Sequence, residues 1–170
     1  NLVTGNGLDT AGWYAMVRGR MTEINGKPIT DVQKDSHESF RRELNLSWTT
    51  VLPEGNKVTK GQWWDTIDLD EFNAQSTDGQ IVAPVSLEDE LAGELGLVLG
   101  DRITFSVGGL RFEAEMVGTR SLNWDNMTPN FYFLFPEGLL EEYPRTSMTS
   151  LYIPPEKKLL VNDILRQFPT

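Results

Sequence analysis

Apolar and polar residues alternate with a period of two along several short stretches, which is the pattern of strands that bury one face. In residues 14–24, small or apolar residues partly alternate with charged ones. Asn25-Gly26 follows directly and is a strong turn signal. Residues 28–42 are polar and irregular, and the alternation resumes over residues 43–49. We therefore predict strands over 14–24 and 43–49, with a turn and a loop between them.

A β-hairpin is predicted in the second half of the chain. Residues 101–107 alternate cleanly, and residues 110–117 alternate again. Gly108-Gly109 stands between them, and two glycines suit a two-residue hairpin turn because its central positions favour residues that tolerate a positive φ.

A short amphipathic helix is predicted just before this hairpin. Ser86 followed by Asp89 resembles a capping box, since the hydroxyl can accept from a free amide of the first turn and the acid suits the helix dipole. Gly96 stands where a left-handed residue would end the helix. The apolar face repeats every four residues, at Leu87, Leu91 and Leu95. We expect one core to hold these leucines together with Ile103, Phe105 and Phe133.

The remaining stretches complete a pattern of mixed strands and helices. Residues 130–135 are a continuous apolar and aromatic run between two prolines, which suits a strand buried on both faces. A strand is predicted over 147–153 and a helix from Glu156 onward. Residues 63–79 mix acidic and small polar residues in the manner of a solvated excursion. The predicted fold class is α+β, with mostly antiparallel sheets and short helices.

Composition narrows the class of protein. The chain has 170 residues, a formal net charge of −10 and 39% hydrophobic residues, which suits one ordinary soluble domain. The acidity disfavours general binding to nucleic acid, and the lack of cysteine excludes disulfides and thiolate chemistry. No stretch approaches the roughly 20 apolar residues that span a bilayer. Because the chain opens on Asn1 and ends on a helical pattern, we expect a domain excised from a longer protein.

Residues that could carry catalysis or bind a metal are sparse. His37 is the only histidine, and no Gly-x-Ser-x-Gly elbow accompanies it. An acidic run suggests calcium but lacks the glycine and the distal glutamate of an EF-hand; its members are Asp65, Asp68, Asp70 and Glu71. We therefore predict no catalytic, cofactor-binding or metal-binding residue.

The tryptophans are the candidate contact residues, because an indole stacks well and keeps one polar group. Packing within the core or between subdomains is the alternative. Three of them are predicted as contacts to a partner or cargo: Trp63, Trp64 and Trp124. Trp124 lies in a polar turn, and we expect its indole to be largely buried.

Several blocks of sequence, in order, carry a resemblance to a known family. The run from Val85 to Phe105 contains a short helix that ends in Leu-Gly-x-x-x-Gly-Asp and leads into a hairpin. This arrangement resembles the extracytoplasmic, MacB-like periplasmic core domain of FtsX-like, MacB-type ABC transporter permeases. Three further blocks are similar to the YbbP-like subgroup of these permeases, namely residues 17–28, 42–48 and 123–138. The resemblance spans about residues 13–169.

The resemblance implies a non-catalytic periplasmic domain of a bacterial inner-membrane permease. ATP would be bound by a cytoplasmic ATP-binding subunit that docks on the permease, and no cofactor is expected in this domain. The domain would relay ATP-driven motion to lipid-like or hydrophobic cargo, or to a periplasmic protein. Residues 1–32 and 146–170 would form a truncated membrane-proximal subdomain, with residues 33–145 as an inserted β-rich subdomain. A free-standing carboxylate-based hydrolase and a soluble lipid-binding carrier are the alternatives.

Overall fold

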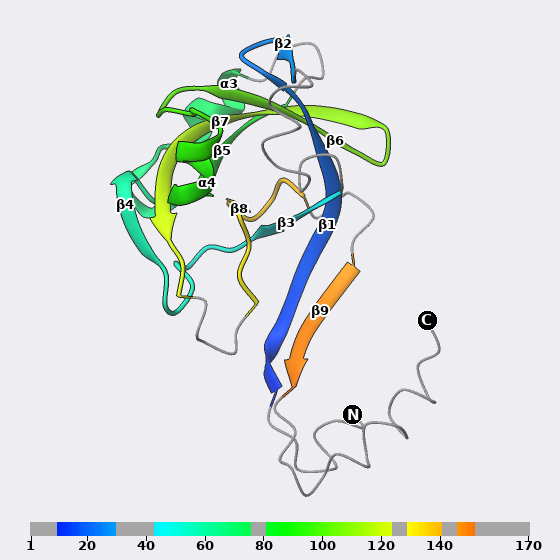
Figure 1. Cartoon of the computed structure of the whole chain (residues 1–170), viewed down its shortest axis with the longest axis vertical. Helices are drawn as coiled ribbons and strands as arrows, with labels where there is room; N and C mark the ends of the chain where they lie inside the picture. Colours follow the sequence, from blue (N-terminus) through cyan, green and yellow to red (C-terminus); the bar gives the residue numbers. More distant parts are fainter. Residues whose placement is uncertain (1–9, 30–42, 76–80, 124–128, 141–145, 152–170) are drawn as a thin grey trace, which may run out of the picture.

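The structure is a computed structural model that describes residues 10–29, 43–75, 81–123, 129–140 and 146–151. Its helices are short: the 3₁₀ helix η2 (Trp64–Thr66), α3 (Leu69–Gln75) and α4 (Asp89–Glu94). Its strands are β1 (Thr10–Ile24), β2 (Lys27–Pro28), β3 (Leu44–Trp48), β4 (Lys57–Gly61), β5 (Val82–Glu88), β6 (Arg102–Val107), β7 (Leu110–Ser121), β8 (Phe133–Phe135) and β9 (Thr146–Leu151). The described part is therefore mainly β, as Figure 1 shows.

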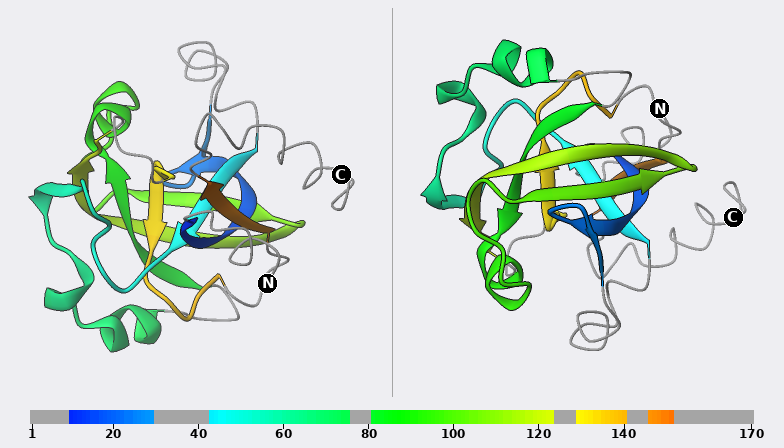
Figure 2. Two further views of the ribbon diagram at one scale, coloured as in Figure 1. Left: turned by 90° about the horizontal axis from the view of Figure 1, so that it is seen from below. Right: turned by 90° about the horizontal axis from the view of Figure 1, so that it is seen from above.

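The sheet closes on itself as a six-stranded, barrel-like ring. Neighbours around the ring are β1, β3, β8, β5, β7 and β6, and β6 pairs back to β1. Figure 2 shows these strands in two views along the long axis of the molecule. Pairing is antiparallel except between β3 and β8 and between β5 and β7, which confirms the prediction of mostly antiparallel sheets with short helices.

Strand β1 belongs both to the ring and to a two-stranded arm. Its first part, Thr10 to Met16, pairs with β9, and its remainder pairs with β3 and β6. The arm leaves the ring at one end of the molecule (Figure 1). At Gly19 an added Cβ would lie 2.8 Å from a methyl carbon of Leu46 and 2.9 Å from one of Val107, so a larger residue in β1 would require these side chains to shift. The residues of β1 thus join an arm to a barrel. The predicted division into subdomains at residues 32 and 146 stays a prediction.

The locally coded turns form as predicted. Asn25 and Gly26 both have positive φ, of 51° and 72°, and turn β1 into β2. Gly108 and Gly109 have φ of 57° and 87° and join β6 to β7, so the predicted hairpin is confirmed. The strands predicted around residues 43–49 and 147–153 are present as β3 and β9.

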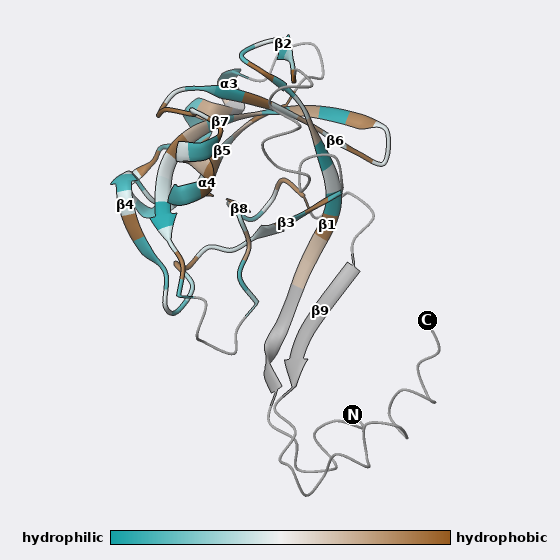
Figure 3. Ribbon diagram, in the orientation of Figure 1, coloured by the Kyte–Doolittle hydropathy of each residue, from teal (hydrophilic) through white to brown (hydrophobic). Residues whose placement is uncertain are grey.

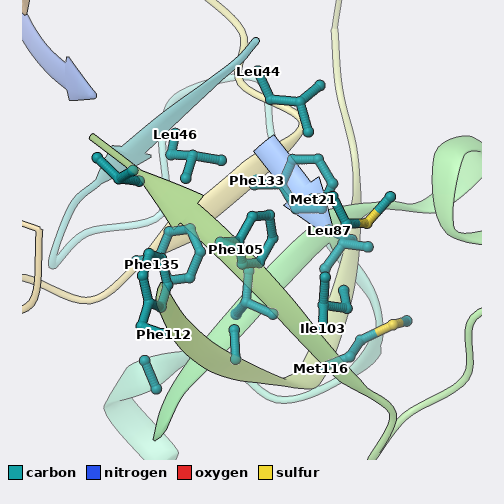
Figure 4. Packing of buried hydrophobic residues seen from close by; sticks show 14 of the residues in the cluster. Met21, Leu44, Leu46, Leu87, Ile103, Phe105, Phe112, Met116, Phe133 and Phe135 are labelled. Atoms are coloured by element: carbon teal, nitrogen blue, oxygen red, sulfur yellow. The ribbon is translucent and has the colours of Figure 1, made fainter. Parts of the chain in front are cut away.

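Aromatic side chains fill the centre of the ring (Figure 4). The ring centroid of Phe105 lies 5.5 Å from that of Phe112 in a stacked pair, and 5.3 Å from that of Phe133 in an edge-to-face pair. The predicted core set is confirmed: Leu87, Leu91, Ile103, Phe105 and Phe133 are buried in one cluster, and Leu95 packs against it. Figure 4 shows Leu87, Phe105 and Phe133 converging from strands that are far apart in sequence.

The helix begins three residues later than predicted. Ser86 and Leu87 lie in β5, all of whose residues are buried, and α4 begins at Asp89. Pairing of β5 with β7 and β8 decides the backbone conformation here, and it overrides the local signal of the serine. The cap is the Glu88 carboxylate, while the predicted end is correct because Gly96 has a φ of 66°.

Two further expectations need correction. Residues 63–75 are not simply a solvated excursion, because they contain η2 and α3 and bury Trp63, Trp64 and Phe72. The run at 130–135 forms only a three-residue strand, β8, and Tyr132 is 41% exposed. The helix predicted from Glu156, together with His37 and Trp124, lies outside the described residues.

Truncating Leu91 to alanine should lower the free energy of unfolding by about 2 to 5 kcal/mol, because it leaves a cavity between α4 and the barrel core. Leu91 is 6% exposed, whereas Leu110, at the tip of the hairpin, is 62% exposed and provides the matched control. Urea unfolding of both alanine variants measures the difference. A Leu91 variant as stable as the Leu110 variant would show that α4 does not depend on this contact.

Candidate functional site

A surface groove of about 790 Å³ lies between α4, the loop after it, and strands β4 and β7. Its apolar wall includes Ala92, Leu97 and Met116, which are buried at its base. Val98 and Leu99 line it as well, and their side chains are 63% and 46% exposed. The groove therefore presents apolar surface to its surroundings.

The loop that carries Val98 and Leu99 is held in place by hydrogen bonds. The Asp101 carboxylate accepts from the amide of Val98 at 2.9 Å and from the side-chain amide of Asn25 at 2.9 Å. The amide of Gly100 donates to the carbonyl of Met116 at 2.8 Å. The exposed apolar side chains thus stand on a fixed backbone.

Opposite charges stand on the two sides of the groove. Lys60 lines it from β4, and Asp89 and Glu90 line it from the first turn of α4. A register shift between Val58 and Lys60 marks a bulge in β4, and consecutive residues Thr59 and Lys60 both line the groove. Figure 3 shows β4 and α4 coloured largely as hydrophilic.

Helix α4 is fixed to the barrel by Glu88. The carboxylate oxygens of Glu88 accept from the amide of Leu91 at 2.7 Å and from that of Glu90 at 3.2 Å. Glu88 is only 4% exposed. Burial raises the pKa of its carboxyl above the ordinary 4.5, and these two hydrogen bonds oppose the rise.

Arg120 stands on β7 between Thr119 and Ser121, which line the groove, and its side chain is fully buried. Its guanidinium donates to the carbonyl of Ser86 at 2.7 Å, to the side-chain oxygen of Asn56 at 3.1 Å, and to the carbonyl of Phe131. Burial lowers the pKa of Arg120 to about 9, and the charge of Glu88 opposes this change. Arg120 therefore ties β5 and β7 to the turn before β4 and to the segment before β8.

The pKa of Glu88 predicts a pH dependence of stability. Because the folded state holds this proton more tightly than the unfolded state does, the contribution of Glu88 is most favourable below pH 4.5 and is lost as pH rises through the raised folded-state pKa. The free energy of unfolding of the wild type, minus that of Glu88→Gln, should therefore fall across this range. Urea unfolding of both proteins from about pH 4 to about pH 7 measures it. A difference in unfolding free energy that stays constant with pH would contradict a raised pKa of Glu88.

The predicted contact residues Trp63 and Trp64 pack on the side of the barrel where residues 49 and 50 run. Their indoles are 7% and 5% exposed, and their ring centroids are 4.3 Å apart. The Trp64 indole N–H donates to the carbonyl of Thr49 at 2.8 Å, and that of Trp63 donates to the carbonyl of Thr50 at 3.2 Å. Neither indole lines the groove. Packing accounts for both residues, and their contact with a partner stays a prediction, as does that of Trp124.

The acidic run serves as the start of a helix. The amide of Asp70 donates to the Asp68 carboxylate at 3.0 Å, and Asp70 and Glu71 lie in the first turn of α3. Within the described ranges, no three His, Cys, Asp or Glu residues are clustered so that they could hold a metal ion. Also within those ranges, no helix is both long enough and apolar enough to cross a bilayer.

Sequence comparison relates the chain to a transporter. No protein-family model matches the chain. It is 36% identical over 158 residues to a protein of Escherichia coli strain K12 described as "Uncharacterized ABC transporter permease YbbP". The match covers 93% of this chain and 17% of that permease. The chain is therefore related to an ABC transporter permease, and it aligns with one segment of that protein.

Proposed function

We propose that this chain is a non-catalytic, extracytoplasmic domain of a bacterial ABC transporter permease of the FtsX-like, MacB-type class. The similarity to a permease over 93% of the chain carries this proposal. The domain would lie on the periplasmic side of the inner membrane. A cytoplasmic subunit would bind and hydrolyse ATP, so that this domain needs no cofactor of its own.

The fold suits a domain that transmits movement. Helix α4 and strand β4, which border the groove, are joined to the barrel core through Glu88 and Arg120. The barrel continues through β1 into the two-stranded arm, so a displacement of the arm would act on the barrel through one continuous strand. In the permease, such a displacement would couple ATP hydrolysis to movement or export of lipid-like or hydrophobic cargo, or to a periplasmic protein.

Chemical labelling tests the location. The chain has no cysteine, so Val51→Cys introduces a single thiol into this segment at a residue that is 73% exposed. In a full-length permease whose other cysteines have been removed, a membrane-impermeant maleimide should label this thiol in cells whose outer membrane has been permeabilised. A cysteine in the ATP-binding subunit is the control and should react only after lysis. Labelling of Val51→Cys only after lysis would contradict the proposed location.

A further inference from the structure

In the described part of the chain, β4 is an edge strand beside the groove. Among the residues that the structure describes, β4 pairs only with β7. An edge strand presents a row of peptide N–H and C=O groups that can pair with another extended chain. An added strand would place every second side chain on the face that carries the groove.

The groove beside this edge offers what such a strand would need. Its apolar lining suits aliphatic side chains at alternate positions, and Val98 and Leu99 stand exposed on a loop that hydrogen bonds hold in place. Lysines and a bulge are common devices that guard an edge against aggregation, and β4 has both. Protection against aggregation does not explain why Val98 and Leu99 are exposed beside the edge of β4.

Charge indicates which strand would fit. Lys57 and Lys60 give β4 two positive charges in a chain whose net charge is −10. A second copy pairing β4 against β4 would bring four lysines together, which is unfavourable. A segment whose acidic residues lie next to Lys57 and Lys60 would instead gain from the same charges. Its acidic residues must face β4, because Asp89 and Glu90 on the opposite side of the groove would repel them.

We propose that β4 and the adjoining groove bind an extended segment of a partner protein, with aliphatic and acidic residues, which adds to the sheet as a strand. The inference deepens the proposed function, because it identifies the surface on which a periplasmic partner protein would bind. It rests on that function only for its biological setting. Binding by the isolated chain does not depend on transport. The labelling experiment in the permease and the binding experiment below can therefore fail separately.

The probe is a phage-displayed library of linear 12-residue peptides, selected on the purified chain. We expect a consensus with aliphatic residues at alternate positions and with acidic residues. A synthetic consensus peptide is then N-methylated on either its odd or its even residues. Only one of these two sets should weaken binding, by about tenfold or more, because only alternate amides of an added strand face β4. Equal effects of the two sets, or no enriched peptide, would overturn the proposal.

Matched variants locate the site. Lys60→Glu and Val98→Ser should each weaken binding of the consensus peptide by about tenfold. Lys27→Glu and Val51→Ser change exposed residues outside the groove and should leave affinity unchanged. Unfolding midpoints verify that all four variants fold. Controls that weaken binding as much as the groove variants would overturn the proposal, as would self-association of the chain that Lys60→Glu abolishes.

Discussion

Replacing Arg120 with leucine should lower the free energy of unfolding by about 3 to 5 kcal/mol. This is the usual cost of removing one partner from a buried, hydrogen-bonded pair of charged residues. The guanidinium is fully buried and supplies donors to Ser86, Asn56 and Phe131. Leucine would leave these acceptors without that donor and would remove the positive charge that interacts with Glu88. Urea unfolding at neutral pH measures the loss.

Two companion variants separate charge from geometry. Arg120→Lys keeps the charge but not the planar set of hydrogen-bond donors. Its free energy of unfolding should therefore lie between those of the wild type and Arg120→Leu. Arg18 lies on β1 and is exposed, so Arg18→Leu should change the free energy of unfolding by no more than about 0.5 kcal/mol. If Arg120→Leu behaved like Arg18→Leu, the buried guanidinium would contribute little to the fold.

The two turns predicted correctly from sequence are encoded within a few neighbouring residues. Asn25-Gly26 and Gly108-Gly109 each favour their turn through their own backbone freedom, whatever surrounds them. The predicted start of α4 was wrong because it depends on distant residues. Ser86 carries a good local capping signal, but its backbone belongs to β5, whose parallel pairing with β7 depends on residues about thirty positions away.

The site depends still more on distant residues. Residues 59–60, 89–99 and 116–121 form the groove, and no local pattern shows that these three segments meet. One signal for the buried arginine was present, because Phe112, Ala114 and Met116 point inward in alternation and Arg120 continues the same phase. A charged residue at a core-facing position indicates a hydrogen-bonded interior group. The tryptophans were predicted as contact residues instead, because an indole stacks well and keeps one polar group.

The function that we propose for the domain predicts the largest effect. In the full-length permease, replacing the segment that corresponds to residues 13–169 with a flexible glycine-serine linker should leave assembly with the ATP-binding subunit intact, because we place that contact on the other side of the membrane. The same replacement should abolish whatever phenotype depends on the permease, because nothing would then connect ATP hydrolysis to the periplasmic side. Copurification of the two subunits and membrane insertion are the controls.

Single changes should behave differently from this replacement. In a domain that transmits movement, exposed carboxylates such as Asp65 and Asp70 can be changed to asparagine with little loss, since neither would act as an acid, a base or a nucleophile. In a carboxylate-based hydrolase, one such change would remove several powers of ten in activity while the protein stayed folded.

The most direct measurement is therefore the permease-dependent phenotype of cells that carry the linker replacement, with assembly measured in the same cells. Our account predicts a fully assembled transporter that has lost the phenotype completely. Retention of the phenotype by that assembled transporter would contradict the claim that this domain couples ATP hydrolysis to work outside the membrane.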